Sequence, residues 1–136
     1  MTQFEYRGEL TREGKADFLR SIDINCVPSP YADPKGLYIL ESMAVGTPVA
    51  SPAHGAFPEL IEATGGGLIS EQDDALSLAD SIDRLLSDPI RARVMGIHGR
   101  TVVLERFTAD AMAQRFAALC MQELQKRGLR ERTGVR

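Results

Sequence analysis

The chain has 136 residues, of which 43% are hydrophobic and 26% charged, and its formal net charge is −3. A chain of this length forms one domain that buries about 68% of the surface its unfolded form exposes, so it needs no disulfide or metal staple. The slightly acidic balance gives no reason to expect nucleic acid or an anionic membrane as a partner. No apolar run approaches the roughly 18 residues of a membrane span, and no signal peptide is visible, which predicts a cytoplasmic protein. Cys26 and Cys120 lie far apart in apolar contexts, which predicts reduced core residues.

The N-terminal part of the chain predicts a strand, a helix and a second strand. Phe4 to Tyr6 alternates apolar and polar residues and is followed by a glycine, which predicts an edge strand. Thr11 is placed to cap the helix that follows. Ile22 to Val27 alternates before it becomes apolar, as expected of a strand that approaches the middle of a sheet.

The stretch from 28 to 59 holds most of the functional information. Five elements follow one another there: a loop with Asp33, a helix at Gly36–Val45, a strand at Pro48–Ser51, a loop with His54 and Gly55, and a helix with Pro58 in its first turn. Strand, polar loop and helix, repeated, are typical of a parallel α/β sheet. Ligands of such sheets lie at the carboxyl ends of the strands, where these loops are expected.

The C-terminal half predicts one more strand and three helices. Leu68–Ile69 is a short strand after a glycine-rich turn, which lacks the Lys-Ser/Thr that completes a phosphate loop. The helices are one capped by Asp73 or Asp74, one from Ile90 to about Glu105, and one from Thr108 to Gly128. We therefore expect an α/β, Rossmann-like three-layer sandwich with four short parallel strands. About six helices in total are expected to cover the two faces of the sheet.

The start of the Gly36–Val45 helix is a candidate anion site. Gly36 and Leu37 are expected to present free backbone N–H groups at the positive end of the helix, where a phosphate is favoured. Gly36 also lacks the Cβ that would hold a phosphate away from the backbone. Asp33 precedes this site and Glu41 lies beside it, as carboxylates that accept hydrogen bonds from sugar hydroxyls. These residues predict a nucleotide-sugar site, and we see no metal-ligand constellation.

The run DPKGLYILESMAVGTPVAS, followed by GAFPELI, resembles the E-x7-E region of retaining GT-B glycosyltransferases of family four, the glycosyl transferases group 1, and the similarity extends over residues 4–124. The resemblance implies that Asp33 contacts the donor sugar and that Glu41 holds ribose hydroxyls. It also implies that the amides of Gly36 and Leu37 meet the pyrophosphate. The alternatives for the two acids are an ordinary loop acid and a solvated helix acid.

Three residues depart from the pattern of the family, and three further loop residues are candidates for the site. Asp33 is one methylene shorter than the glutamate of the family, Ala56 replaces a glycine, and Lys35 replaces an aromatic residue and either contacts phosphate or is solvated. Glu59 stands at the glutamate of the G-G-x-P-E loop, or it simply stabilises a helix dipole. His54 and Gly55 are further loop candidates, with His54 either a catalytic base or an ordinary loop histidine.

The resemblance also implies a domain organisation. Residues 1–127 correspond to part of a nucleotide-sugar-binding domain, and residues 128–136 form a basic flexible tail. We expect the second half of a donor domain, inactive alone, because the acceptor domain and the segment that neutralises the diphosphate have no counterpart. The alternative is a free-standing, non-catalytic binding or assembly module. Expected partners are a weakly bound nucleotide-sugar and either a second copy, through an uncovered sheet edge, or a separate N-terminal domain; no cofactor or metal is expected.

Overall fold

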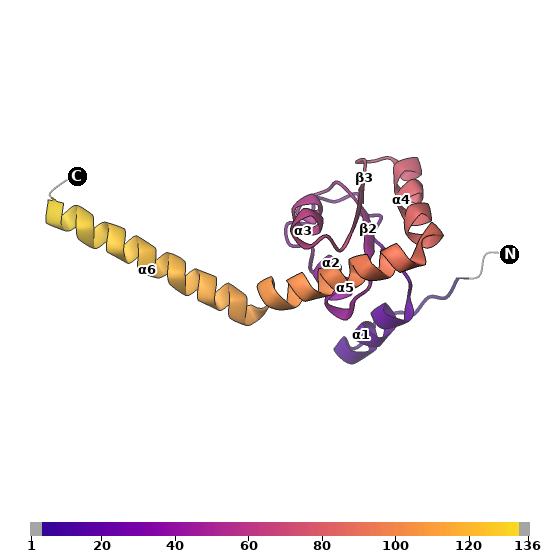
Figure 1. The fold of residues 1–136 in the computed structure, drawn as a ribbon, viewed down its shortest axis with the longest axis horizontal. Coiled ribbons are helices and arrows are strands. Elements are labelled where there is room, and N and C mark those ends of the chain that lie inside the picture. Colours follow the sequence, from indigo (N-terminus) through magenta and orange to yellow (C-terminus); the bar gives the residue numbers. More distant parts are fainter. Residues whose placement is uncertain (1–3, 134–136) are drawn as a thin grey trace. The chain divides into compact units, whose positions relative to one another are not determined.

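The structure, a computed structural model, describes residues 4–133, and its contacts divide the chain into two units, Met1–Val103 and Leu104–Arg136 (Figure 1). The first unit holds three parallel strands in the order β1 (Asn25–Cys26), β2 (Val49–Pro52) and β3 (Gly67–Ser70). Its helices are α1 (Arg12–Ser21), α2 (Leu37–Val45), α3 (Phe57–Thr64), α4 (Ala75–Ser87) and most of α5 (Pro89–Arg106). The second unit holds the end of α5 and α6 (Ala109–Thr133). The expected α/β fold with a parallel sheet is confirmed.

The central strand β2 is buried along its whole length because both of its edges and both of its faces are covered. On one face Ala50 packs with Leu85 of α4 and Ala92 of α5. Helices α2 and α3 contact each other, and α3 and α4 lie on opposite sides of the strands (Figure 1). The α2–α3 layer contributes Ile39 and Phe57, whose side chains are fully buried. Successive side chains of a strand point to opposite faces of the sheet, and helices cover both faces of β2. A short apolar run with no polar face therefore lies in the middle of the sheet.

Helix α5 crosses the amino-terminal ends of the strands at very short range. A Cβ on Gly96 would lie 2.1 Å from the carbonyl oxygen of Gly46, which precedes β2. A Cβ on Gly99 would lie 2.7 Å from the Cα of Gly66, which precedes β3. Two glycines therefore let α5 close this end of the sheet, and the loops at the carboxyl ends of the strands lie on the other side.

The helix starts follow the expected local signals. Thr11 Oγ1 accepts a hydrogen bond from the first turn of α1, and Thr108 Oγ1 does the same for α6. Pro58 lies in the first turn of α3. Of the two candidates for α4, Asp74 is the cap and accepts two backbone hydrogen bonds, while Asp73 adopts a left-handed conformation with φ of 56°. A cap of this kind contributes about 0.5–2 kcal/mol to stability.

The prediction of a strand at Phe4–Tyr6 is wrong. That segment forms no strand, and the side chains of Phe4 and Tyr6 are 91% and 87% exposed. The predicted strand at Ile22–Val27 is reduced to β1, which pairs with β2 alone. An extended segment becomes a strand only when a neighbouring strand takes up its backbone hydrogen bonds, and alternation in the sequence does not supply that neighbour.

Two further predictions are also wrong. Cys26 and Cys120 are exposed rather than buried, because β1 is an edge strand and because the residues of α6 around Cys120 are themselves exposed. Gly128 does not end the last helix, since α6 continues to Thr133. A glycine inside a helix costs only about 1 kcal/mol relative to alanine, so the good helix formers on both sides of it continue the helix. The flexibility predicted for residues 128–136 stays a prediction, and the last three of these lie outside the described residues.

Candidate functional site

The loops that follow β1 and β2 pack backbone against backbone at the carboxyl ends of the strands. The Ala56 N–H donates a hydrogen bond to the Asp33 carbonyl oxygen at 2.9 Å. Gly55 approaches the same residue so closely that a Cβ would lie 2.2 Å from the Asp33 oxygen and 2.6 Å from its nitrogen. Gly55 also has a φ of +51°, a conformation that glycine adopts without steric penalty. The structure therefore brings two of the predicted site residues, Asp33 and Gly55, into direct contact.

The Asp33 side chain lies at the start of α2, where an anion was expected. Its Oδ1 accepts hydrogen bonds from the backbone N–H of Gly36 at 2.6 Å and of Lys35 at 2.7 Å. These two bonds, that of Gly36 first, hold the pKa of Asp33 below its ordinary value. The Gly36 N–H that we assigned to a pyrophosphate is thus paired with a carboxylate of the chain itself. The Leu37 N–H, first in the helix, has no acceptor among residues 4–133.

Gly36 is required by the conformation and packing of this turn. It adopts φ of 58° and ψ of 36° as the residue before α2. A Cβ there would lie 2.6 Å from Leu60 Cδ1 and 3.5 Å from the Phe57 ring, both on α3. The start of α2 therefore rests directly on α3, which fixes the direction of its N–H groups.

Tyr38, in the first turn of α2, belongs to the site although the sequence analysis did not single it out. Its ring packs edge-on against Phe57, with ring centroids 5.6 Å apart and an interplanar angle of 73°. Burial raises the pKa of the Tyr38 phenol, and the nearby negative charge of Asp33 raises it further. The available signal was its position two residues after Gly36, where the first helical turn faces back toward the loop that carries Asp33.

Glu41 lies one turn further along α2 and forms an ion pair that we did not predict. Its Oε1 is 2.6 Å from Nζ of Lys15, which extends from α1, and the two side chains are 42% and 44% exposed. A pair exposed to this extent contributes about 0–1 kcal/mol, so another hydrogen-bond donor can displace it at little cost. The pair also brings the positive charge of Lys15 to the position where ribose hydroxyls were expected.

His54 follows β2 and is buried, unlike an ordinary loop histidine. Its Nε2 lies 3.3 Å from Oδ1 of Asp73, the residue with the left-handed backbone after β3. The two line a pocket of about 200 Å³ together with Pro28, Ser29 and other residues at the carboxyl ends of the strands. The pairing of His54 with Asp73 required the tertiary structure, because 18 intervening residues include a helix and a strand.

The remaining candidates lie at the rim of the site. Lys35, Leu37 and Glu59 are all exposed, and Glu59 occupies the first turn of α3. Their roles as contacts to a ligand stay predictions. Between residues 4 and 133 no group of three or more histidine, cysteine, aspartate or glutamate side chains is arranged to hold a metal ion. No helix in this range is long and apolar enough to cross a membrane.

The sequence matches the family described as Glycosyl transferases group 1 over residues 2–102, which is nearly the whole of the first unit. The chain therefore belongs to this family. The resemblance to GT-B glycosyltransferases that the central motif indicated is confirmed.

Relatives and solved structures agree with this assignment. The GDP-mannose-dependent monoacylated alpha-(1-6)-phosphatidylinositol monomannoside mannosyltransferase of Corynebacterium glutamicum is 30% identical over 125 residues, which cover 88% of this chain and 32% of that protein. The phosphatidyl-myo-inositol mannosyltransferase of Mycobacterium leprae is 31% identical over 98 residues, which cover 71% of this chain and 26% of that protein. The present chain thus spans about a third or less of these relatives.

Two solved structures superpose on the chain. Sucrose-phosphate synthase from Thermosynechococcus elongatus matches with a TM-score of 0.76 and 34% identity, over 88% of this chain and 30% of that one. Anabaena HepE, solved in complex with UDP, matches with a TM-score of 0.70 and 22% identity, over 77% of this chain and 29% of that one. The second likeness concerns the fold alone.

Proposed function

We propose that this chain supplies the second half of the nucleotide-sugar donor-binding domain of a retaining glycosyltransferase, which transfers a sugar from a nucleoside-diphosphate sugar to an acceptor. One observation carries the proposal: the loops after β1 and β2 are locked together by Gly55 and Asp33 at the carboxyl ends of the strands, beside the N-terminus of α2. Ligands of parallel α/β sheets bind at this end. A relative that aligns with 88% of the chain is named as GDP-mannose-dependent, which supports the same class of donor.

The residues at the start of α2 and in the loop before it have the following roles in this proposal. The Leu37 N–H and the positive end of α2 attract the diphosphate, and Lys35 adds charge at the rim. The Glu41 carboxylate accepts hydrogen bonds from the ribose hydroxyls once Lys15 is displaced. Asp33 contacts the donor sugar when its carboxylate turns away from the Gly36 N–H, which is then free for a phosphate oxygen.

We further propose that the chain alone binds its donor weakly and does not transfer sugar. An exposed helix terminus contributes about 0.3–1 kcal/mol to binding a phosphate. Hydrogen bonds to a charged group such as Glu41 add about 1.5–3 kcal/mol. The sum, about 2–4 kcal/mol, corresponds to a dissociation constant of about 1 mM at the tightest. Transfer also requires an acceptor hydroxyl held next to the anomeric carbon of the donor sugar, and such positioning is worth about 7–11 kcal/mol of the barrier.

The alternative function is a free-standing binding or assembly module without transferase chemistry. The internal pairing of the site favours it, since Asp33 already occupies two backbone N–H groups and Glu41 is already paired with Lys15. Such a module has no need for a vacant donor site. The two functions therefore differ in whether these internal contacts give way to a nucleotide-sugar.

An NMR titration of the ¹⁵N-labelled chain with nucleoside diphosphates and their sugars tests the proposal. We expect shifts in the loop containing Asp33 and at the start of α2, and about tenfold weaker binding by Glu41→Gln, because 1.4 kcal/mol is a factor of ten. Lys15→Gln removes the same ion pair but keeps the carboxylate, so it separates the two effects. Glu62→Gln, on the exposed side of α3, is the matched control. Micromolar binding by the chain alone, including binding that the loss of the Glu41 carboxylate abolishes, contradicts the proposal, and so does sugar transfer by the chain alone. No binding of any nucleotide favours the alternative.

Association through the sheet edge belongs to the same proposal. In the strand order β1-β2-β3, the outer edge of β1 faces no other strand of the described chain. Unpaired backbone groups on such an edge pair readily with a second chain. We propose that a second copy or a separate N-terminal domain covers this edge. Sedimentation of the chain at tens of micromolar tests the first of these, and a clean monomer contradicts it.

A further inference from the structure

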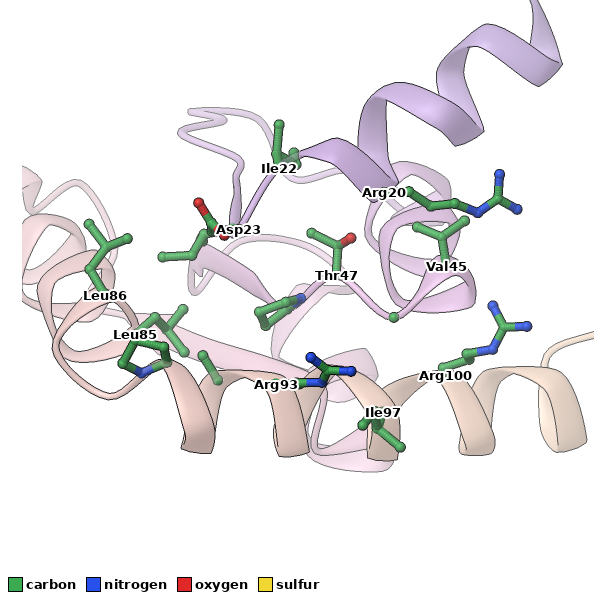
Figure 2. Close-up of a pocket in the computed structure, with 15 residues that line it drawn as sticks. Arg20, Ile22, Asp23, Val45, Thr47, Leu85, Leu86, Arg93, Ile97 and Arg100 are labelled. Atoms are coloured by element: carbon green, nitrogen blue, oxygen red, sulfur yellow. The ribbon is translucent and has the colours of Figure 1, made fainter.

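A second pocket, of about 830 Å³, lies at the amino-terminal ends of β1 and β2 (Figure 2). It is formed by the segments that precede these strands, by the end of α4 and by one side of α5. All of its lining residues belong to the first unit. The loops of Asp33 and Gly55 follow the same strands at their other ends, so this pocket is separate from the candidate donor site.

The walls of this pocket are largely apolar. Its lining includes the side chains of Ile22, Ile24, Leu85, Leu86 and Ile97. Leu86 and Ile97 are 55% and 54% exposed, so a large part of their apolar surface is available to a ligand. The volume lies within the roughly 300–1,000 Å³ that is typical of small-molecule sites.

The charges of the pocket are strongly one-sided. Its lining contains three arginines, Arg20, Arg93 and Arg100, against a single acid, Asp23. Figure 2 shows Arg20 and Arg100 on either side of Val45, with Arg93 extending from α5 toward Thr47, whereas Asp23 lies near Leu86 at the other end. The excess positive charge is therefore gathered at one end of an otherwise apolar pocket.

The three guanidinium groups differ in how far they are already engaged. Arg20 pairs with Asp17 on its own helix at 2.9 Å, and Arg100 donates to the Ala44 carbonyl oxygen at 2.6 Å. Arg93 makes no ion pair or side-chain hydrogen bond with the residues between 4 and 133. A guanidinium presents five donors in a planar fork that matches a carboxylate or a phosphate, so each arginine keeps donors for an anion.

We propose that this pocket binds an anionic amphiphile, with a carboxylate or phosphate group held by Arg93, Arg20 and Arg100 and an apolar chain lying along Ile97, Leu85 and Leu86. The ligand we infer is a dissolved molecule that fits the pocket, such as a medium-chain fatty acid or alkyl phosphate. Each CH₂ group that it buries raises its affinity by about fourfold. The head group supplies the specificity, because a neutral amphiphile leaves the arginines without an anion.

Titration of the chain with dodecyl phosphate, followed by NMR below the micelle concentration, tests this proposal. We expect shifts in α5 and before β2, about tenfold weaker binding by Arg93→Gln, and binding by octyl phosphate weaker than that by dodecyl phosphate. Arg91→Gln is the matched control, because Arg91 is exposed on the same helix and does not line the pocket. Circular dichroism confirms that both variants are folded.

Several outcomes overturn the proposal. The arginines of the pocket do not recognise the head group if a neutral detergent with the same chain length binds equally well. The same follows if Arg91→Gln and Arg93→Gln lose binding equally. Inorganic phosphate that binds as tightly as dodecyl phosphate shows that the apolar walls contribute nothing. Co-sedimentation with phosphatidylglycerol vesicles without binding of dissolved dodecyl phosphate assigns the arginines to a membrane surface instead. If nucleoside diphosphates compete with dodecyl phosphate, both ligands bind in one site, which also overturns the proposal. A donor titration that shows no nucleotide binding leaves the proposal unaffected.

Discussion

Gly55→Ala tests the contact that holds the two loops of the candidate site together. Gly55 has a φ of +51°, and a new Cβ would lie 2.2 Å from the backbone oxygen of Asp33. A non-glycine residue in the left-handed region costs about 1–2 kcal/mol. Forcing a methyl group into a filled space costs typically about 1–3 kcal/mol more, and here the obstacle is backbone, which cannot swing aside. We therefore expect the free energy of unfolding to fall by about 2–5 kcal/mol.

Thermal and urea denaturation, followed by circular dichroism, measure this loss. For a chain of 136 residues, 1 kcal/mol lowers the melting temperature by about 3–5 °C, so the expected fall is at least about 6 °C. Because the contact orders the loop that carries Asp33, we also expect the backbone NMR signals of Asp33 and Gly36 to shift more than those of α4.

Substitutions at two other glycines separate the conformational cost of a left-handed residue from the steric cost of the new methyl group. Gly8 has a φ of +62° and nothing within 4 Å of a new Cβ, so Gly8→Ala carries the conformational cost alone. Gly96 lies inside α5 with the Gly46 carbonyl oxygen 2.1 Å from a new Cβ, so Gly96→Ala carries the steric cost, reduced by about 1 kcal/mol of helix propensity. A Gly55→Ala variant no less stable than Gly8→Ala refutes the reasoning, because it shows that the loops have room to separate.

Two further predictions concern titratable groups. The pKa of Asp33 is lowered in the folded chain, so its hydrogen bonds stabilise the fold above the ordinary value of about 3.9, and this stabilisation is lost as the pH falls through the lower, folded-state pKa. The urea midpoint should therefore fall less between pH 6 and pH 3 in Asp33→Asn than in the unsubstituted chain. The exposed control Asp83→Asn should behave as the unsubstituted chain. Equal falls in all three proteins contradict a stabilising role of the Asp33 carboxylate. Both cysteines are exposed, but partial burial of the Cys26 thiol raises its pKa. A disulfide reagent at pH 8 should therefore label both without denaturant but Cys26 more slowly than Cys120. Equal rates in the Cys26→Ser and Cys120→Ser variants, which isolate one thiol each, contradict this order.

Local patterns in the sequence predicted the helices, the strands β2 and β3 and most of the loops of the site, but they also predicted a strand at Phe4–Tyr6 that the structure lacks. The caps at Thr11 and Asp74, the proline in the first turn of α3 and the buried run of β2 all depend on residues within a few positions of one another. The pairing of Asp33 with the Gly36 N–H is equally local, since the two residues are three positions apart, although the sequence analysis assigned that N–H to a phosphate. Signals of this range survive in any arrangement of the elements, so the sequence sufficed to identify the α/β fold and the loop at the start of α2.

The tertiary structure decided the contacts between elements. Lys15 meets Glu41 across 26 positions only because α1 packs on α2, and Gly55 touches Asp33 only because β1 and β2 are paired in one register. The same pairing leaves Cys26 at an exposed edge, against the prediction from its apolar neighbours. A hydrophobic pattern records which side chains avoid water, but the partner that covers each of them depends on the packing of whole helices and strands, which no short stretch of sequence encodes.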